Sequence, residues 1–207
     1  MIWGKEFQKR RAANIFPFDK VPIIFVSDKT IAQSGSIARY AAKLANCYPS
    51  DPVECAFSDS IFELAQEMCT INPLINCMIG QQFLQVKQWY FQQWPNHMEH
   101  LTRQLESRSE FFGGDSCTFA DFNVFHMINN AITIEKDCID DYESIKKWYK
   151  TMENLSGLKD YLANRPRLEG IGTNPGLVDK SGTRVSQMEN PEGVCQLVDD
   201  CFVFHKD

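Results

Sequence analysis

The N-terminal part of the chain carries a short apolar run, a turn and a second, shorter run. The first is the β-branched stretch "IIFV", opened by Pro22 and closed by the turn "SDK", and the second is "TIA". Apolar runs of this composition on either side of a short turn are typical of two paired strands. The pattern therefore predicts a β-hairpin within residues 22–32.

An amphipathic helix is predicted directly after this hairpin. Ser34 offers a side-chain oxygen to cap the first turn, and the helix should stop near Asn46. Apolar residues recur at intervals of three and four, which places them on one face of a helix. This stripe consists of Ile37, Tyr40, Ala41 and Leu44.

The stretch "CYPSDP" carries two prolines and an Asp-Pro pair, and it predicts a linker between two domains. Beyond it the apolar spacing is helical throughout. Pro73 should kink or break the first long helix, and Trp94-Pro95 should begin the next one. The inward-facing residues of these two helices are predicted to be Phe57, Ile61, Leu64, Met68, Met98, Leu101 and Leu105.

The stretch "GGDSCTFADFNVF" supplies a turn and then a helix start. Thr118 and Asp121 have the spacing of a capping box, in which each side chain accepts a hydrogen bond from the backbone N–H of the other residue. This is a folding signal rather than an active site. Two further helices are expected, one around Trp148 and a short one over "GLKDYLANRP" that ends at Pro166.

Composition excludes several classes of function. The 207 residues are 43% hydrophobic and carry 27 acidic and 21 basic side chains, for a formal charge of -6. A chain of this length can bury a core, and its acidic balance argues against nucleic acid as a partner. No apolar run approaches the roughly 20 residues that span a bilayer, so a soluble, intracellular protein is expected. The basic start "KEFQKRRAAN" is interpreted as a solvated turn.

The cysteines and histidines do not predict a metal site. None of the eight cysteines forms a CxxC pair, and most lie in apolar helical stretches, where reduced, structural thiols are expected. Cys195 and Cys201 are the two that are not expected to be buried. His97 and His100 share one helical face, but no further ligand is placed near them in the sequence, so a solvated helix surface is expected.

Several motifs now stand in a recognisable order. The hairpin, "QSGSIARY", the linker, the all-helical part, "FFGGDSCTFADF" and "LKDYLANRPRLEG" together resemble the cytosolic glutathione transferases, nearest to the sigma, mu and pi classes. The resemblance runs from about Trp3 to Gly170. It implies an α+β fold that is mostly α: a truncated thioredoxin-like lobe at residues 1–46, a linker at 47–53, an all-helical domain at 54–170 and a C-terminal extension at 171–207.

The resemblance assigns glutathione-binding roles to residues around the hairpin. Pro22 matches the family's cis-proline, which turns the backbone of Val21 outward so that it pairs with the cysteinyl unit of glutathione. Gln33 and Ser34 match the pair that holds the γ-glutamyl carboxylate. Ser34 also stands where helix N–H groups and the positive end of the helix dipole favour an anion.

Further residues are assigned by the same resemblance. Glu67 falls where the family usually has an Asp that reaches the γ-glutamyl amine of the neighbouring subunit, and Lys20 stands where a Gln or Asn is usual. Trp3, with one of Lys9, Arg10 or Arg11, matches the Trp and Lys near the glycyl end. Phe18 falls near the aromatic residue through which several classes form a homodimer.

A catalytic hydroxyl is not identified. In the resembling family about 35 residues, carrying the Tyr, Ser or Cys beside the thiol, precede the Trp that matches Trp3, and this sequence has no counterpart for them. Free glutathione thiol has a pKa of about 8.5, so without that group conjugation should fall toward the background rate. The shortened lobe should also need a cover for Ile23, Phe25 and Ile37, from "VCQLVDDCFVFH" or from a partner protein.

Two hypotheses of function remain. The first is a transferase-like subunit that is catalytically impaired and serves as a structural or interaction module in a larger assembly. The alternative is an active glutathione transferase whose catalytic N-terminal segment is missing from this chain. A third possibility keeps glutathione binding without catalysis, through Val21, Gln33 and Ser34.

Overall fold

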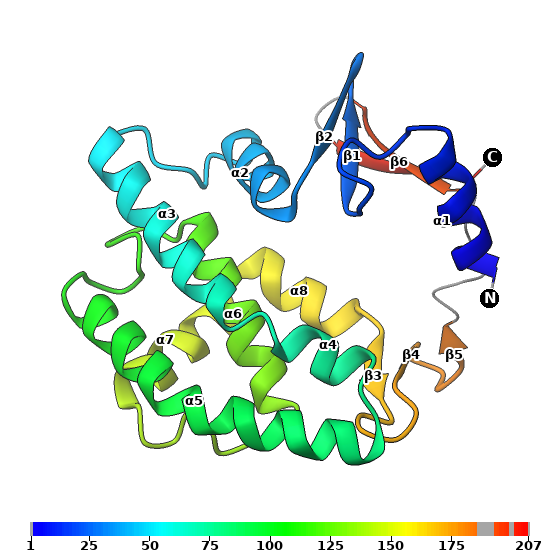
Figure 1. Cartoon of the computed structure of the whole chain (residues 1–207). Coiled ribbons are helices and arrows are strands. Elements are labelled where there is room, and N and C mark those ends of the chain that lie inside the picture. The colour runs from blue at the N-terminus through cyan, green and yellow to red at the C-terminus, as the bar shows by residue number, and fades with distance from the viewer. Residues whose placement is uncertain (1, 186–192, 199–200, 207) are drawn as a thin grey trace. The chain divides into compact units, whose positions relative to one another are not determined.

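A computed structural model describes residues 2–185, 193–198 and 201–206. The chain divides into two compact units (Figure 1). The first unit contains the chain up to Cys47 together with the C-terminal strands, and the second is Tyr48–Val185. Among the described residues, every helix is too short or too polar to cross a lipid bilayer.

The first unit begins with a helix and then forms the predicted hairpin. Helix α1 spans Ile2–Ala12, where a solvated turn was expected. That expectation was wrong because the helix is held locally: the Phe7 ring stacks on the buried Phe16 ring with centroids 5.1 Å apart. Strands β1 (Ile23–Val26) and β2 (Lys29–Ala32) confirm the hairpin. Helix α2 follows at Ser34–Leu44.

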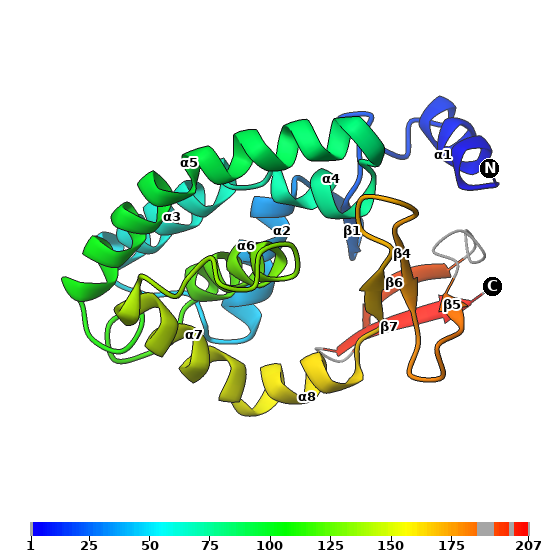
Figure 2. The same ribbon diagram turned by 90° about the horizontal axis from the view of Figure 1, so that it is seen from below.

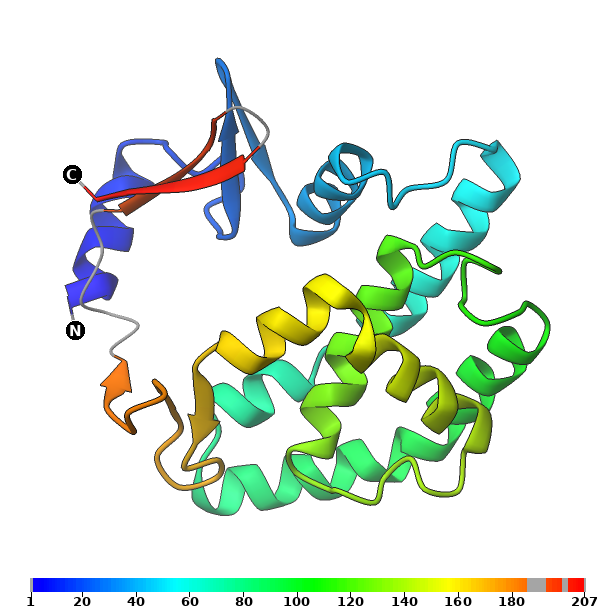
Figure 3. The same ribbon diagram turned by 180° about the vertical axis from the view of Figure 1, so that it is seen from behind.

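The sheet of the first unit is completed from the far end of the chain. Strands β6 (Gly193–Val198) and β7 (Cys201–Lys206) pair with each other antiparallel, and β6 lies parallel to β1 (Figure 3). The strand order is β2-β1-β6-β7. The C-terminal segment therefore provides the strand beside β1.

The second unit is built from helices α3 (Pro52–Glu67), α4 (Ile71–Asn76), α5 (Gly80–Glu106), α6 (Phe119–Ile132), α7 (Glu143–Asn154) and α8 (Ser156–Asn164). Helix α3 packs most extensively against α6, and α5 packs against α7 (Figure 2). The helices around Trp148 and over "GLKDYLANRP" are confirmed.

Two proline predictions about this unit were wrong. Helix α3 ends at Glu67, before Pro73, and Pro73 lies in the first turn of α4, where its missing N–H is not needed. Pro95 does not begin a helix but lies inside α5. The buried stripe continues across it, from Tyr90 and Trp94 to Met98, and this packing outweighs the local preference of proline to end a helix.

A small sheet follows α8. Strands β3 (Arg167–Glu169), β4 (Gly176–Val178) and β5 (Arg184–Val185) form three antiparallel neighbours. The loop between β3 and β4 reaches the start of α5, where the Gly80 N–H donates a 2.8 Å hydrogen bond to the carbonyl of Gly172. Gly172 has φ of +76°, and a Cβ there would lie 2.8 Å from the Phe83 ring. This contact fixes the first turn of α5.

Candidate functional site

The hairpin register brings four of the predicted binding residues to one end of the first unit. Strands β1 and β2 pair with Ile23 opposite Ala32. Val21 and Pro22 directly precede Ile23, while Gln33 and Ser34 directly follow Ala32. Because the strands are antiparallel, these two pairs leave the sheet at the same end. Residues twelve positions apart in the sequence therefore lie close together.

The backbone at this end departs from regular structure in two places. The Val21–Pro22 peptide bond is cis, as the resemblance implies. Gln33 has φ of 72° and ψ of 121° and occupies the N-cap position of α2. The prediction that Ser34 caps the helix was wrong, because the chain turns at Gln33 and Ser34 is already the first helical residue; no side-chain cap bond forms there.

The side chains at this end are accessible. Lys20, Pro22, Gln33 and Ser34 are exposed, and Val21 keeps 47% of its surface in water. Within the described residues, Gln33 and Ser34 make no side-chain hydrogen bond. The N–H groups of the first turn of α2 have no intrahelical partners, as in any helix, so they point toward the same space. This arrangement could hold a carboxylate and pair with an extended peptide backbone.

The remaining predicted residues lie elsewhere. Glu67 is the exposed last residue of α3 and belongs to the second unit. Trp3 lies in α1, and its side chain is outside the described part of the chain. Of the three basic residues considered with it, Arg10 pairs with Glu6 at 2.7 Å and Arg11 pairs with Asp19 at 3.3 Å. The binding roles of all seven residues stay predictions.

Strand β6, the neighbour of β1 on the side opposite β2, contains no hydroxyl residue. In the resembling family the strand next to the hairpin belongs to the segment that bears the catalytic group. Here β6 takes the place beside β1, with Gln196 opposite Phe25. Its sequence, "GVCQLV", contains no Ser, Thr or Tyr. The side chains of β6 and β7, including Cys195 and Cys201, lie outside the described part of the structure.

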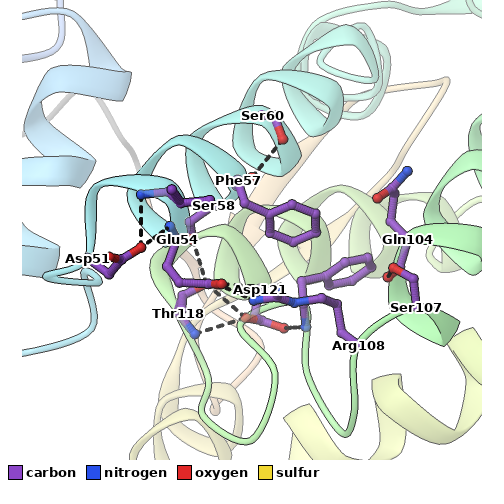
Figure 4. Close-up of polar contacts among 12 residues, drawn as sticks. Asp51, Glu54, Phe57, Ser58, Ser60, Gln104, Ser107, Arg108, Thr118 and Asp121 are labelled. Atoms are coloured by element: carbon purple, nitrogen blue, oxygen red, sulfur yellow. Dashed lines mark hydrogen bonds and ion pairs between the residues drawn. The ribbon is translucent and has the colours of Figure 1, made fainter.

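The second unit contains a buried polar network around Asp121 (Figure 4). The predicted capping box is confirmed, since the Thr118 N–H donates to Asp121 Oδ2 at 2.9 Å. Asp121 Oδ1 accepts hydrogen bonds from the Phe112 N–H at 2.9 Å and from Trp148 Nε1 at 3.0 Å. Burial raises the pKa of Asp121, and the donors partly offset that shift because they stabilise the carboxylate.

This network continues into α3. Ser58 Oγ donates to Thr118 Oγ1 at 2.9 Å, and both side chains are buried. Glu54, one helical turn before Ser58 in α3, forms an ion pair with the Arg108 guanidinium. This guanidinium also lies over the Phe57 ring, 4.4 Å from its centroid. Ser58, Thr118, Asp121 and Trp148 are joined by hydrogen bonds, so the network holds α3, α6 and α7 together.

Histidine and cysteine positions do not form a metal site in the described part of the chain. No group of three or more His, Cys, Asp or Glu side chains there could hold a metal ion. Burial lowers the pKa of His97, while Glu67 opposes that shift and His100 adds to it. His97 Nδ1 is buried and has no hydrogen-bond partner among the described residues.

Six cysteines in the described residues are free thiols. The expectation that helical cysteines are buried was wrong for Cys69 and Cys77, which are exposed because they lie at the turn after α3 and at the end of α4. Burial raises the pKa of Cys138 to about 12, so this thiol is not ionised at neutral pH. Of these six thiols, only Cys47 belongs to the first unit.

Comparison with known sequences identifies relatives over most of the chain. The family model "Glutathione S-transferase, C-terminal domain" matches residues 72–165. A glutathione S-transferase of Plasmodium yoelii yoelii is 24% identical over 165 residues, covering 77% of this chain and 75% of that protein. Glutathione S-transferase 1 of Ascaris suum is 26% identical over 157 residues, covering 73% and 76%.

Solved structures share the fold. The Pi-class glutathione S-transferase of Onchocerca volvulus superposes with a TM-score of 0.67 at 21% identity, over 77% of this chain and 76% of that chain. Prostaglandin synthase D of Nilaparvata lugens gives a TM-score of 0.65 at 20% identity, over 79% and 82%. The expected fold, a partial thioredoxin-like lobe followed by an all-helical domain, is confirmed.

Proposed function

We propose, from the premise that the chain belongs to the cytosolic glutathione S-transferase family, that it binds glutathione weakly, is impaired in catalysis, and serves as an interaction subunit of a larger assembly. The observation that supports this proposal is the register of the hairpin. It brings Val21, Gln33 and Ser34 to one accessible end of the first unit, and it leaves β1 with β6 as its other neighbour.

Glutathione is the ligand that this end of the unit fits. Its γ-glutamyl carboxylate would accept hydrogen bonds from Ser34 and from the first turn of α2. Its cysteinyl backbone would pair with the backbone of Val21, an exposed residue next to Pro22. Lys20, also exposed, supplies a positive charge next to an anionic peptide. Glu67 and Trp3 belong to the proposed site by resemblance.

The composition of the strand beside β1 supports the proposal of impaired catalysis. A glutathione transferase must favour the thiolate of its substrate, because a free thiol with a pKa of about 8.5 is only a few per cent ionised at pH 7. Strand β6 brings no Ser, Thr or Tyr to the position beside β1, and Cys195 is its one residue of a type that the family uses beside the thiol. Binding without thiolate stabilisation should leave the reaction close to its uncatalysed rate.

An interaction role is supported by what the first unit exposes. Phe18 keeps 59% of its surface in water, and Ile15, Val21 and Leu44 are also exposed. Residues 1–47 carry eight Lys or Arg and only three Asp or Glu, whereas the whole chain is acidic. Exposed apolar side chains beside this basic N-terminal segment are suited to an acidic protein partner. Residues 186–207 of the same unit carry five Asp or Glu and one Lys. A homodimer through Phe18 is the other contact that this surface could make.

The second candidate is an active transferase whose catalytic segment lies outside this chain. It is favoured by the intact end of the hairpin, with the cis Val21–Pro22 bond and the turn at Gln33 both present. In that case β6 would have to leave β1 before another strand could pair there.

Calorimetric titration of the full chain with glutathione tests the binding step. We expect weak binding that falls at least about tenfold in Ser34→Ala, since one hydrogen bond to a charged group is lost. Gln8→Ala, at an exposed position in α1, is the control. Absence of heat for the wild-type chain would contradict glutathione binding.

Turnover of a chlorodinitrobenzene-type electrophile tests the catalytic step separately. The expected rate with the full chain is close to that of glutathione alone. A rate far above background, lost in Ser34→Ala, would establish the active enzyme instead. Capture of an acidic protein that depends on Phe18 and is lost at high salt would support the interaction role.

A further inference from the structure

Helix α7 places three lysines on its outer side. Lys146, Lys147 and Lys150 lie within five consecutive residues, so their backbone positions span about 6 Å along the helix axis. Lys147 and Lys150 are exposed, and neither forms an ion pair among the described residues. The surrounding unit is acidic, because residues 48–185 carry 19 acidic and 12 basic side chains. The three lysines therefore form a local positive patch on a negatively charged unit.

Two adjoining hollows lie over this patch. The first has a volume of about 580 Å³, and the three lysines, Thr151 and Asn154 contribute to its lining. The second, of about 460 Å³, extends to Glu110, beyond the end of α5. Lys147 and Thr151 line both hollows, so the two adjoin. Each volume lies in the range of sites that hold small molecules.

The two hollows differ in charge. The first combines the three ammonium groups with one carboxylate, that of Glu143, so its lining is positive overall. The second is lined by the carboxylates of Glu106 and Glu110 and by hydroxyl groups, which include that of Ser144. Lys147 stands at the junction and belongs to both. A ligand that fills both hollows should therefore be anionic at one end and carry hydrogen-bond donors at the other.

We propose that the two hollows together bind one small phosphorylated molecule that also carries hydroxyl or amino groups. Its phosphate lies between Lys147 and Lys150, because the ammonium of Lys146 is already paired with Asp140 at 2.6 Å. Lysine binds phosphate as a point charge and forms short, charge-assisted hydrogen bonds with it. Nucleotides and sugar phosphates both have the required division between an anionic end and a donor end.

The second hollow selects the donor end of the ligand. Glu106 already accepts a hydrogen bond from Ser144 Oγ, whereas Glu110 is exposed and has no hydrogen-bond or ion-pair partner among the described residues. The Glu110 carboxylate accepts hydrogen bonds from hydroxyl or amino groups and repels a second anionic group. An acidic peptide or an inorganic polyanion therefore fits less well than a molecule with a single phosphorylated end. Because both hollows are open to water, we expect a Kd of about 0.1 mM.

Calorimetric titration of the full chain with ADP, and separately with ribose 5-phosphate, tests the proposal and distinguishes the two kinds of ligand. In magnesium-free buffer, at least one of them should bind once per chain. The double variant Lys147→Gln, Lys150→Gln should weaken that binding at least about tenfold, because two charge-assisted hydrogen bonds are lost. The matched control, Lys29→Gln with Lys136→Gln, removes the same charge at exposed positions elsewhere and should bind like the wild type.

Inorganic pyrophosphate tests the role of the second hollow. Glu110→Ala should weaken binding of the better ligand at least about threefold, because an acceptor for its donor groups is lost. The same change should leave the affinity for pyrophosphate unchanged or higher, because it removes a repelling charge. Equal weakening of both would contradict a role for this hollow. Helical circular dichroism confirms that each variant is folded.

An NMR titration with the better ligand gives a second measurement. Shifts centred on residues 105–110 and 143–155 support the proposal, and shifts confined to other segments contradict it. Three calorimetric results would overturn it: neither ligand binds, only pyrophosphate binds, or the control variant loses as much affinity as the variant at Lys147 and Lys150. Ser34→Ala should leave every one of these readouts unchanged. None of them involves glutathione, so the outcome does not depend on the proposed function.

Discussion

The helical unit has a large apolar core and a buried carboxylate whose hydrogen-bond donors come from the same unit, whereas few of the described side chains of the first unit are buried. Among the buried hydrophobic residues described, only Phe16 and Ala42 belong to the first unit. Asp121, in contrast, accepts hydrogen bonds from four buried donors, which belong to Phe112, to Thr118 at the start of α6 and to Trp148 in α7. This difference indicates that the helical unit supplies most of the stability.

Separating the two units is the strongest test of this comparison. A fragment of residues 48–185 should keep its helical circular dichroism and unfold cooperatively, since its core and its polar network are internal. A fragment of residues 1–47 should lack stable structure, because a two-stranded hairpin with one helix is marginal in water. A folded 1–47 fragment, or an unfolded 48–185 fragment, would reverse the assignment.

Asp121→Asn should produce the next largest effect. The amide keeps one acceptor oxygen but turns an NH2 group toward donors, so at least one buried N–H loses its partner. We expect the free energy of unfolding, measured with urea on the full chain, to fall by about 3 kcal/mol. Asp115→Asn, at an exposed position of the preceding loop, should change it little. Equal effects of the two changes would mean that the network does not stabilise the unit.

His97 should give the smallest effect, visible as a dependence on pH. Its pKa is lowered in the folded state, so protonation favours unfolding, and stability should fall as the pH drops below about 6.5. Because the ring is partly exposed, the loss should stay below about 1 kcal/mol. His97→Asn should reduce it, and the remainder should come from His126, whose pKa is also lowered by burial. Glu67→Gln should enlarge it, because the charge that favours the imidazolium is gone. Unfolding at pH 7.5 and 5.5, with an NMR titration of His97, would test the sign.

Features that depend on neighbouring residues were predictable from the sequence. The capping box needs only Thr118 and Asp121, three positions apart, and the hairpin needs only a turn between two apolar runs. Helix α5 was mispredicted because the local effect of Pro95 competes with a buried stripe that extends on both sides of it. The bond between Ser58 and Thr118 joins residues 60 positions apart, and no sequence signal marks it.

The features of the candidate site were likewise predictable only where they depend on neighbouring residues. Pro22, Gln33 and Ser34 could be named because they flank a recognisable hairpin, but the left-handed turn at Gln33 that displaces the cap could not. The sequence marked the stretch "VCQLVDDCFVFH" as one of two possible covers for the hairpin. Its place beside β1 depends on a contact between residues 25 and 196, which periodicity cannot reveal.

The hydrogen bond from Gly80 to Gly172 sets a limit on how far the protein can be shortened. The family match ends at residue 165, yet the carbonyl that completes the first turn of the longest helix comes from seven residues beyond it. A truncation at that boundary would uncover Phe83 and let the beginning of α5 fray, including the end that bears Gln81 and Leu84. The loop between β3 and β4 therefore stabilises the first turn of α5.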